Sequence, residues 1–303
     1  MPDARAFCLR WQSDFPLHLL AGAQQAGTDF TEPDIVVEQC NWPPPEDAFQ
    51  TQMPACWLGD ERQRLFTENG SVIDVIGADK IQVFLAPDLP LTDPPNIPPE
   101  FYSRAIAIIC AQRGLLPIHG SSVAIGDKAF LLFGESGNGK SSAAAALIGM
   151  GAKLLSDDLS VFFVDNEGVP WALPGRLGIR LSPGTEVLLG KHEGGNQSIS
   201  ESRGKSRFFP PCVECDLPIE LAGMVYMDTT GECDEIPRQF AAPILNQHIF
   251  ARLVLQEMKG STDRYAKVRK IVDHIGCQRI KGLADRAIEP FQKRLKSRFF
   301  RYF

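Results

Sequence analysis

The sequence lacks long apolar runs and any overall excess of positive charge. No apolar run approaches the roughly 18 residues that a membrane-spanning helix needs. No charged and then apolar segment at the N-terminus precedes a small-residue cleavage site. The net charge of −6 gives the chain as a whole no attraction for nucleic acid. We therefore expect a cytoplasmic protein that binds neither nucleic acid nor a membrane.

The spacing of a zinc site is also missing. The eight cysteines are scattered, and Cys212 and Cys215 are the one close pair. A zinc site would need a second pair, or histidines at matching spacing, and the sequence has neither. We expect a structural or incidental role for this pair, with metal binding as the alternative.

What the chain does contain is the composition of an ordinary globular protein, with 44% hydrophobic and 22% charged residues. Its first part alternates short apolar runs with turn signals, which predicts strands at 6–11, 34–38, 71–75 and 80–85. Prolines at 43–45 and between 87 and 99 indicate loops and a boundary. We predict a small β-rich region over residues 1–95 and an α/β domain over residues 96–303.

The α/β domain is predicted to begin with a helix at 98–113, followed by two strands joined by the turn Gly126-Asp127. An alanine-rich stretch at 141–150 has strong helix propensity. Further along, we predict a final strand at 221–227 and two closing helices, at 243–258 and at 262–275.

A phosphate-binding loop motif lies between the second of these strands and the alanine-rich helix. It consists of Gly134, Glu135, Ser136, Gly137, Asn138, Gly139, Lys140 and Ser141. Glycines let backbone N–H groups point at phosphate oxygens, and a helix N-terminus adds a partial positive charge. Lys140 would reach the β- and γ-phosphates, and the Ser141 hydroxyl would hold Mg²⁺. The motif predicts that phosphates bind here.

Two adjacent carboxylates, Asp157 and Asp158, follow the next short apolar run. In nucleotide-binding folds of this kind, ligands lie beyond the carboxyl ends of strands. One carboxylate there can bind Mg²⁺, and the other can accept the proton of an attacking hydroxyl. Turn chemistry is the alternative reason for adjacent aspartates.

One histidine and two groups of cations are further candidates. His119 precedes the loop, where a purely structural histidine is the alternative. Arg176 and Arg180 lie on a glycine-containing turn and strand, and Lys205 and Arg207 follow a polar, glycine-rich segment. Such cations suit phosphate oxygens and are equally common on a solvated surface.

The order of His119-Gly120, the glycine loop and Ser156-Asp157-Asp158 resembles the catalytic domain of the HPr kinase/phosphorylase family. Segments 13–17, 116–123 and 174–181 are similar to a looser group of HPr-kinase-like serine kinases, some of them from lasso-peptide tailoring clusters. This resemblance implies an α/β fold with a P-loop kinase domain of the HPr kinase/phosphoenolpyruvate carboxykinase type. It also implies ATP and Mg²⁺ as cofactors.

The resemblance and the chemistry together predict an ATP-dependent serine kinase. Ser141 and Asp158 would serve Mg²⁺, and Asp157 would take the proton of the acceptor hydroxyl, although the two aspartates could exchange roles. His119 would orient a carboxylate or the phosphate. Lys140 would neutralise the transferred charge, and Ser142, Arg176, Arg180, Lys205 and Arg207 complete the expected nucleotide-binding set.

Two departures from the bifunctional family bear on the substrate. That family has an acidic residue where this chain has Ser142, and residues 174–178 match its phosphorolysis signature only in part. Both differences argue against phosphorylase activity and against HPr as the acceptor. We expect a serine of a peptide or protein as acceptor, including the C-terminal serine of a lasso precursor peptide, and we expect a homo-oligomer.

Other functions remain alternatives at this point. They are an HPr-type regulator of carbon metabolism, a nucleotide-binding regulator without transfer, and a small-molecule enzyme of the carboxykinase type. A membrane-associated scaffold is a fourth, because residues 291–303 carry five basic residues and no acid. For that tail, a solvated helix end or an oligomer contact is the simpler interpretation.

Overall fold

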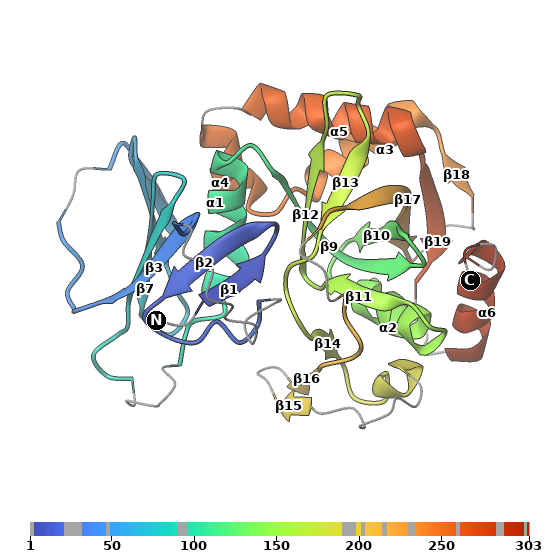
Figure 1. Ribbon diagram of the computed structural model, residues 1–303, viewed down its shortest axis with the longest axis horizontal. Coiled ribbons are helices and arrows are strands. Elements are labelled where there is room, and N and C mark those ends of the chain that lie inside the picture. The colour runs from blue at the N-terminus through green and yellow to red at the C-terminus, as the bar shows by residue number, and fades with distance from the viewer. Residues whose placement is uncertain are drawn as a thin grey trace.

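The computed structural model describes residues 3–20, 32–46, 49–89, 96–189, 198–200, 204–213, 217–229, 234–258, 261–282, 288–299 and 302. Within these residues the protein is a mixed α/β structure with two large sheets and one small one. Figure 1 shows the N-terminal sheet on one side and the second sheet, with most of the helices, on the other.

The N-terminal sheet has the strand order β1-β2-β3-β8-β7-β6-β5-β4. Alternating buried and open positions on β3 and β8 give this sheet one core-facing side. Its strands are β1 (Asp3–Ala6), β2 (Leu9–Ser13), β3 (Ile35–Cys40), β4 (Thr51–Met53), β5 (Cys56–Leu58), β6 (Arg62–Phe66), β7 (Val72–Ile76) and β8 (Lys80–Phe84). All of them fall inside the predicted β-rich region, whereas the residues just before its boundary at 95 lie outside the described residues.

The single strand predicted at 6–11 is wrong. Phe7 and Cys8 have φ angles of 57° and 56°, and they form a tight turn between β1 and β2. The ordinary turn residues are absent there, and the turn is instead held by packing, since Phe7 is 1% exposed. Its backbone N–H also donates to the Pro174 carbonyl.

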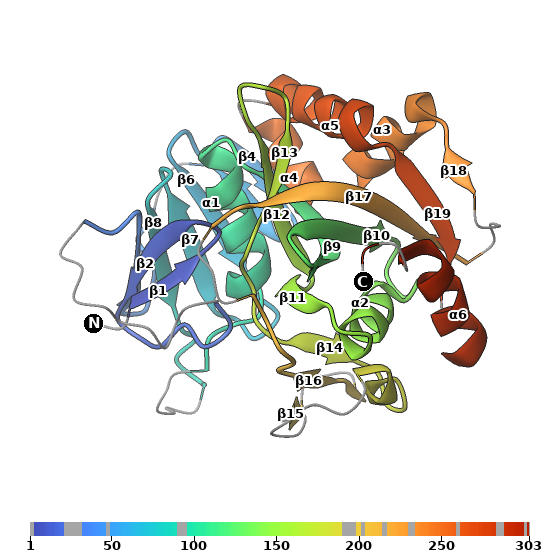
Figure 2. The ribbon, with the colours of Figure 1, turned by 45° about the vertical axis from the view of Figure 1, so that its right-hand side comes forward.

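The second sheet has the order β10-β9-β12-β13-β17-β19-β18, and β11 pairs with β9. Because β10 also pairs with β17, the strands β9, β12, β13, β17 and β10 close a ring (Figure 2). The strands are β9 (Leu116–Ile125), β10 (Lys128–Gly134), β11 (Lys153–Ser156), β12 (Leu159–Val164), β13 (Pro170–Leu173), β17 (Ile219–Asp228), β18 (Glu235–Ile236) and β19 (Cys277–Lys281). A small sheet of β14 (Ile179–Leu181), β16 (Ser206–Phe208) and β15 (Ser198–Ser200) lies beside it.

A buried helix connects the two halves of the molecule. The π-turn η1 (Phe101–Ala105) leads into α1 (Ile106–Gln112), which lies between the two sheets in Figure 1. Residues 106–111 of α1 are at most 6% exposed, as expected for a helix that is apolar on every side. One apolar cluster, with α1 in it, contains residues of both sheets.

Helices cover the second sheet on two sides. α2 (Lys140–Gly149) packs against β9 and β10, and α6 (Ile288–Phe299) packs against α2. α3 (Arg238–Gln247) packs against α5 (Ser261–Ile275), which lies over β12, β13 and β17, and α4 (Arg252–Glu257) also contacts α5. The short 3-10 helix η2 (Glu186–Leu189) contacts α2.

The structure corrects two predictions for the last third of the chain. The helix expected at 243–258 is divided into α3 and α4, and Ala251 between them has a left-handed φ of 53°. The strand expected at 221–227 is present as β17 but is not the last one, because β18 and β19 follow it. In α6, the aromatic residues Phe291 and Phe299 are buried while Lys293 and Lys296 face solvent, which agrees with a solvated helix end.

Candidate active site

The glycine loop joins β10 to α2, as the sequence predicts. Gly134 ends the strand with a φ of 146°, and Gly137 and Gly139 have φ angles of 90° and 88°, a region that side chains disfavour. A Cβ atom on Gly134 would collide with the carbonyl of Met227 on β17. That same carbonyl accepts a hydrogen bond of 2.9 Å from the Asn138 side chain. The loop is therefore held against β17 at two points.

Lys140 begins α2 and folds back over the loop. Its Nζ atom donates to the carbonyls of Gly134 and Glu135, at 2.9 Å and 3.0 Å. Burial lowers the pKa of Lys140, and the charges of Asp157 and Asp158 oppose this effect. The first backbone N–H groups of α2 lack intrahelical partners, as at any helix start. The loop thus offers a fixed cation and several N–H donors, which is the equipment of an anion site.

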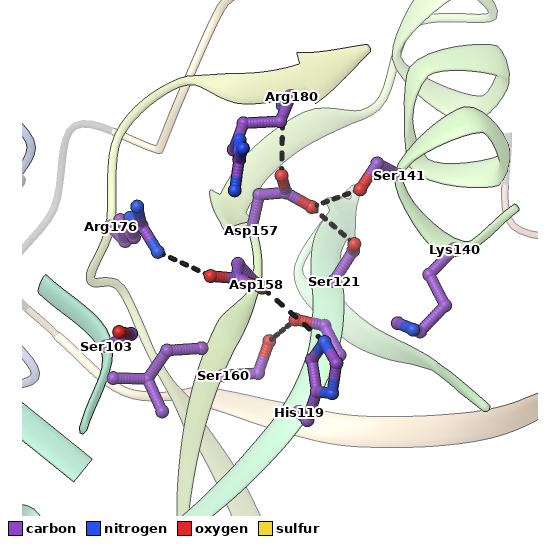
Figure 3. Close-up of polar contacts among 12 residues, drawn as sticks. Ser103, His119, Ser121, Lys140, Ser141, Asp157, Asp158, Ser160, Arg176 and Arg180 are labelled. Atoms are coloured by element: carbon purple, nitrogen blue, oxygen red, sulfur yellow. Dashed lines mark hydrogen bonds and ion pairs between the residues drawn. The ribbon is translucent and has the colours of Figure 1, made fainter. Parts of the chain in front are cut away.

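Asp157, at the end of β11, is buried and surrounded by donors (Figure 3). Its Oδ1 atom accepts hydrogen bonds from the hydroxyls of Ser121 at 2.5 Å and Ser141 at 2.9 Å. Its Oδ2 atom accepts one from the backbone N–H of Arg180 at 3.1 Å. Asp157, rather than Asp158, is thus the carboxylate that contacts the loop serine.

Asp158 points the other way and is paired with two basic side chains. Its Oδ2 atom lies 2.7 Å from Arg176 Nη1, and its Oδ1 atom lies 3.4 Å from His119 Nε2. Burial alone would raise the pKa of Asp158, but the hydrogen bond from His119 and the charge of Arg176 outweigh it and hold the pKa well below its usual range. Asp158 has a φ of 72°, a left-handed conformation that aspartate tolerates better than most residues. Turn geometry and an ionised carboxylate therefore coexist at this position.

A cavity of about 310 Å³ brings most of the predicted site residues together. Two serines that sequence reasoning missed, Ser121 and Ser182, also line it. The predicted residues that line it are His119, Ser136, Gly137, Gly139, Lys140, Ser141, Ser142, Asp157, Asp158, Arg180 and Lys205.

Other predicted residues have different positions. Arg176 is 3% exposed and donates to Asp158, but it does not itself line the cavity. Arg207 is 2% exposed, its guanidinium donates to the carbonyl of Gly178, and it is not among the residues that line this cavity. The side chain of Glu135 is 70% exposed and faces a second cavity.

Sequence reasoning also missed His248, which ends α3 next to the loop. Its carbonyl accepts the backbone N–H of His119 at 2.8 Å, and its ring packs against Phe133 and Tyr226. Burial lowers the pKa of His248 to about 4. Ser121 could have been found, because it lies two residues after His119 on the same strand face. No sequence pattern points to His248.

The donor set suits Mg²⁺ better than a closed metal cage. In the described residues there is no group of three histidine, cysteine or acidic side chains that could hold a metal, and Cys215 lies outside them. Ser141 and Asp157 instead offer two adjacent oxygen donors. Mg²⁺ is commonly bound by one or two carboxylates together with phosphate oxygens and waters.

Of the helices in the described residues, none is long and apolar enough to cross a membrane.

Comparison with known proteins adds little to this geometry. No protein-family model matches the chain, and no curated protein matches it. Among solved structures, it is similar to the HPr(Ser) kinase/phosphatase from Coxiella burnetii, with a TM-score of 0.22 and 16% identity over 36% of this chain. The match spans 58% of that protein's chain, little more than half its length. A likeness of this size carries no functional argument.

Proposed function

We propose that this protein is an ATP-dependent kinase that transfers the γ-phosphate to a hydroxyl group, with a serine of a peptide or protein as acceptor. One observation carries the proposal. The cavity lined by the glycine loop and Lys140 is also lined by two carboxylates. Asp157 accepts a hydrogen bond from Ser141, and Asp158 is paired with His119. Phosphoryl transfer needs a phosphate cradle, a metal site and a group that receives a proton, all in one place.

Ser141 and Asp157 are the residues that would hold Mg²⁺. The Ser141 hydroxyl at the start of α2 lies 2.9 Å from Asp157 Oδ1, to which Ser121 also donates, and the Arg180 N–H donates to Oδ2. This assignment exchanges the roles expected from the sequence, where Asp158 was given to the metal. When bound, Mg²⁺ would neutralise charge on the β- and γ-phosphates.

Asp158 is then the group that receives the acceptor's proton. The acceptor oxygen forms a bond to the γ-phosphorus while the bond between that phosphorus and the bridging oxygen breaks. ADP leaves, and the hydroxyl proton passes to Asp158. Arg176 and His119 keep Asp158 ionised and therefore able to accept a proton, although its low pKa makes it a weak base. A transition state with little covalent character demands more of positioning than of basicity.

Transfer of labelled γ-phosphate from ATP to serine-containing peptides tests the proposal. Wild type should label peptide, and Lys140→Ala should abolish labelling because the β- and γ-phosphates lose their cation. Asp127→Asn, on an exposed turn of the same domain, is the control and should label as wild type does. A wild-type protein that binds ATP and labels no hydroxyl acceptor would refute the proposal.

That last outcome would favour a second function, a nucleotide-binding regulator without transfer. The observation behind it is Ser142, which lines the cavity where the bifunctional kinase family has an acidic residue. HPr and the C-terminal serine of a lasso precursor peptide are two candidate acceptors for the kinase. Labelling trials with each would separate them.

A further inference from the structure

A second cavity of about 560 Å³ lies beside the candidate active site, and the transfer chemistry uses little of it. The turn between β4 and β5, Leu65 of β6 and Arg104 of η1 line it on the N-terminal side. The segment from Gln247 to Val254, which joins α3 to α4, lines it on the other. The molecule thus builds this cavity from both of its halves.

The two cavities adjoin, because His119 and Ser136 line both of them. The larger cavity also includes Gly134 and Glu135, the residues whose carbonyls hold the Lys140 ammonium. That lysine marks where the β- and γ-phosphates lie in such a loop. The larger cavity therefore opens on the γ-phosphate side of the loop, where an acceptor must approach.

The lining combines apolar surface with unpaired cations. Leu65 and Cys56 are nearly fully buried behind the lining, whereas Leu253, which also lines the cavity, is 60% exposed and offers apolar surface to a ligand. Within the described part of the chain, the side chains of Arg104 and Arg252 have no hydrogen-bond or ion-pair partner. Glu135 is the one acid in the lining, so cations outnumber acids two to one.

We propose that this cavity binds the acceptor segment of a peptide that carries an apolar side chain near the serine and a carboxylate that pairs with Arg104 and Arg252. The inference rests on the proposed kinase function and names the substrate class of that site. The volume falls in the range of about 300–1,000 Å³ typical of ligand sites, and it exceeds what one serine side chain fills. Guanidinium groups match carboxylates in geometry and charge.

The test compares three synthetic fluorescent peptides with one serine each. The first has the sequence leucine–serine–aspartate at its centre, the second replaces the aspartate by asparagine, and the third replaces the leucine by glycine. Fluorescence anisotropy with saturating ADP gives peptide affinity without requiring transfer. A fluorescent ATP analogue gives nucleotide affinity, and labelled ATP gives transfer.

The double variant Arg104→Gln/Arg252→Gln should bind the acidic peptide roughly tenfold or more weakly than wild type, because two charge-assisted hydrogen bonds are lost. The asparagine and glycine peptides should bind wild type more weakly than the first peptide does. Arg238→Gln, at an exposed arginine of α3 outside the cavity, is the matched control and should leave peptide binding unchanged. Affinity for the ATP analogue should be the same in all three proteins.

Three results would overturn the inference. They are no peptide binding to wild type, equal binding to the double variant, or a parallel loss of nucleotide affinity, which would assign the cavity to the nucleoside. Failure of the kinase proposal has a different signature. There, the acidic peptide binds wild type and depends on the arginines, yet receives no phosphate.

Discussion

Among single residues, the neighbouring aspartates show how strongly local environment divides two identical side chains. Asp157 is 1% exposed and accepts three hydrogen bonds from uncharged donors. Asp158 is more open and faces a guanidinium and an imidazole. Both carboxylates line the cavity, but Asp157 is hydrogen-bonded to Ser141 at the start of α2, whereas Asp158 is paired with Arg176 and His119.

Replacing each aspartate in turn should therefore give different defects. Asp158→Asn should lower the rate of phosphate transfer about 10²–10⁴-fold, the usual contribution of a proton acceptor, while ATP still binds. Asp157→Asn should raise the Mg²⁺ concentration needed for half-maximal transfer. Transfer rates measured across a Mg²⁺ titration distinguish the two, and identical Mg²⁺ curves for both variants would contradict the assignment.

The buried imidazole of His248 should make the fold sensitive to mild acid. Its pKa is about 4 in the fold and 6.5 for an exposed histidine. Above pH 6.5 the ring is neutral in both states, and as pH falls from 6.5 to 4 only the unfolded chain takes up the proton. The free energy of unfolding should fall by about 3 kcal/mol over that interval, at roughly 1.4 kcal/mol per pH unit.

Urea unfolding at several pH values measures this dependence. His248→Gln should be less stable at pH 7 and lose less stability between pH 6.5 and 4 than wild type does. His274→Gln, on the exposed face of α5, should follow the wild-type curve. The same slope in wild type and His248→Gln would show that other groups cause the acid sensitivity.

Among the elements, the strand–loop–helix unit at β10 and α2 depends on close approach of the backbone to β17. Gly134 lies in the left-handed half of φ space and directly against the Met227 carbonyl. Gly126, in the turn before β10, also has a positive φ of 60° but faces open space. Both glycines have a positive φ, but only Gly134 also has a backbone carbonyl where a Cβ atom would lie.

Alanine at these two positions should separate backbone strain from collision. Gly126→Ala should cost about 1 kcal/mol of stability, the strain of a left-handed alanine. Gly134→Ala should cost clearly more and weaken nucleotide binding, because the loop must move away from β17. Thermal unfolding with and without ATP measures both effects, and equal melting temperatures would contradict the collision.

The elements that sequence patterns predicted are those whose signals are local. The β9–β10 hairpin, the glycine loop and α2 follow from a turn dipeptide, a glycine motif and alanine-rich composition. The turn at Phe7-Cys8 and the break at Ala251 have no such signal, because packing holds ordinary residues at positive φ. The same difference is seen in the site. The alternation of side chains along β9 predicts that Ser121 lies on the same face as His119, whereas only the tertiary structure brings His248 next to the loop.

At the scale of the whole molecule, one apolar cluster around α1 includes residues on both sides of the boundary that the sequence predicts at residue 95. Trp11 and Ile35 of the first sheet belong to the same cluster as Leu116 and Val161 of the second. The interface is thus as apolar as a domain core, whereas interfaces between mobile domains are usually more polar.

We therefore expect the two sheets to unfold together. Urea unfolding followed by far-UV circular dichroism, which reports on both halves, should coincide with fluorescence of a variant that retains only Trp171 of β13. The control is a variant that retains only Trp11, which reports on the first sheet. Within either variant, a fluorescence midpoint that differs from that variant's own circular dichroism midpoint would show that the halves are independent domains.

The closed ring of strands has a consequence for motion. β10 is hydrogen-bonded to β9 on one side and to β17 on the other, so the strand that carries the glycine loop has no free edge. We therefore expect the loop to stay in place when substrates bind. The α3–α4 segment is itself hydrogen-bonded to β9, through His248 and Phe250. Of the walls of the larger cavity, the β4–β5 turn is therefore the one we expect to move if the cavity closes on a substrate.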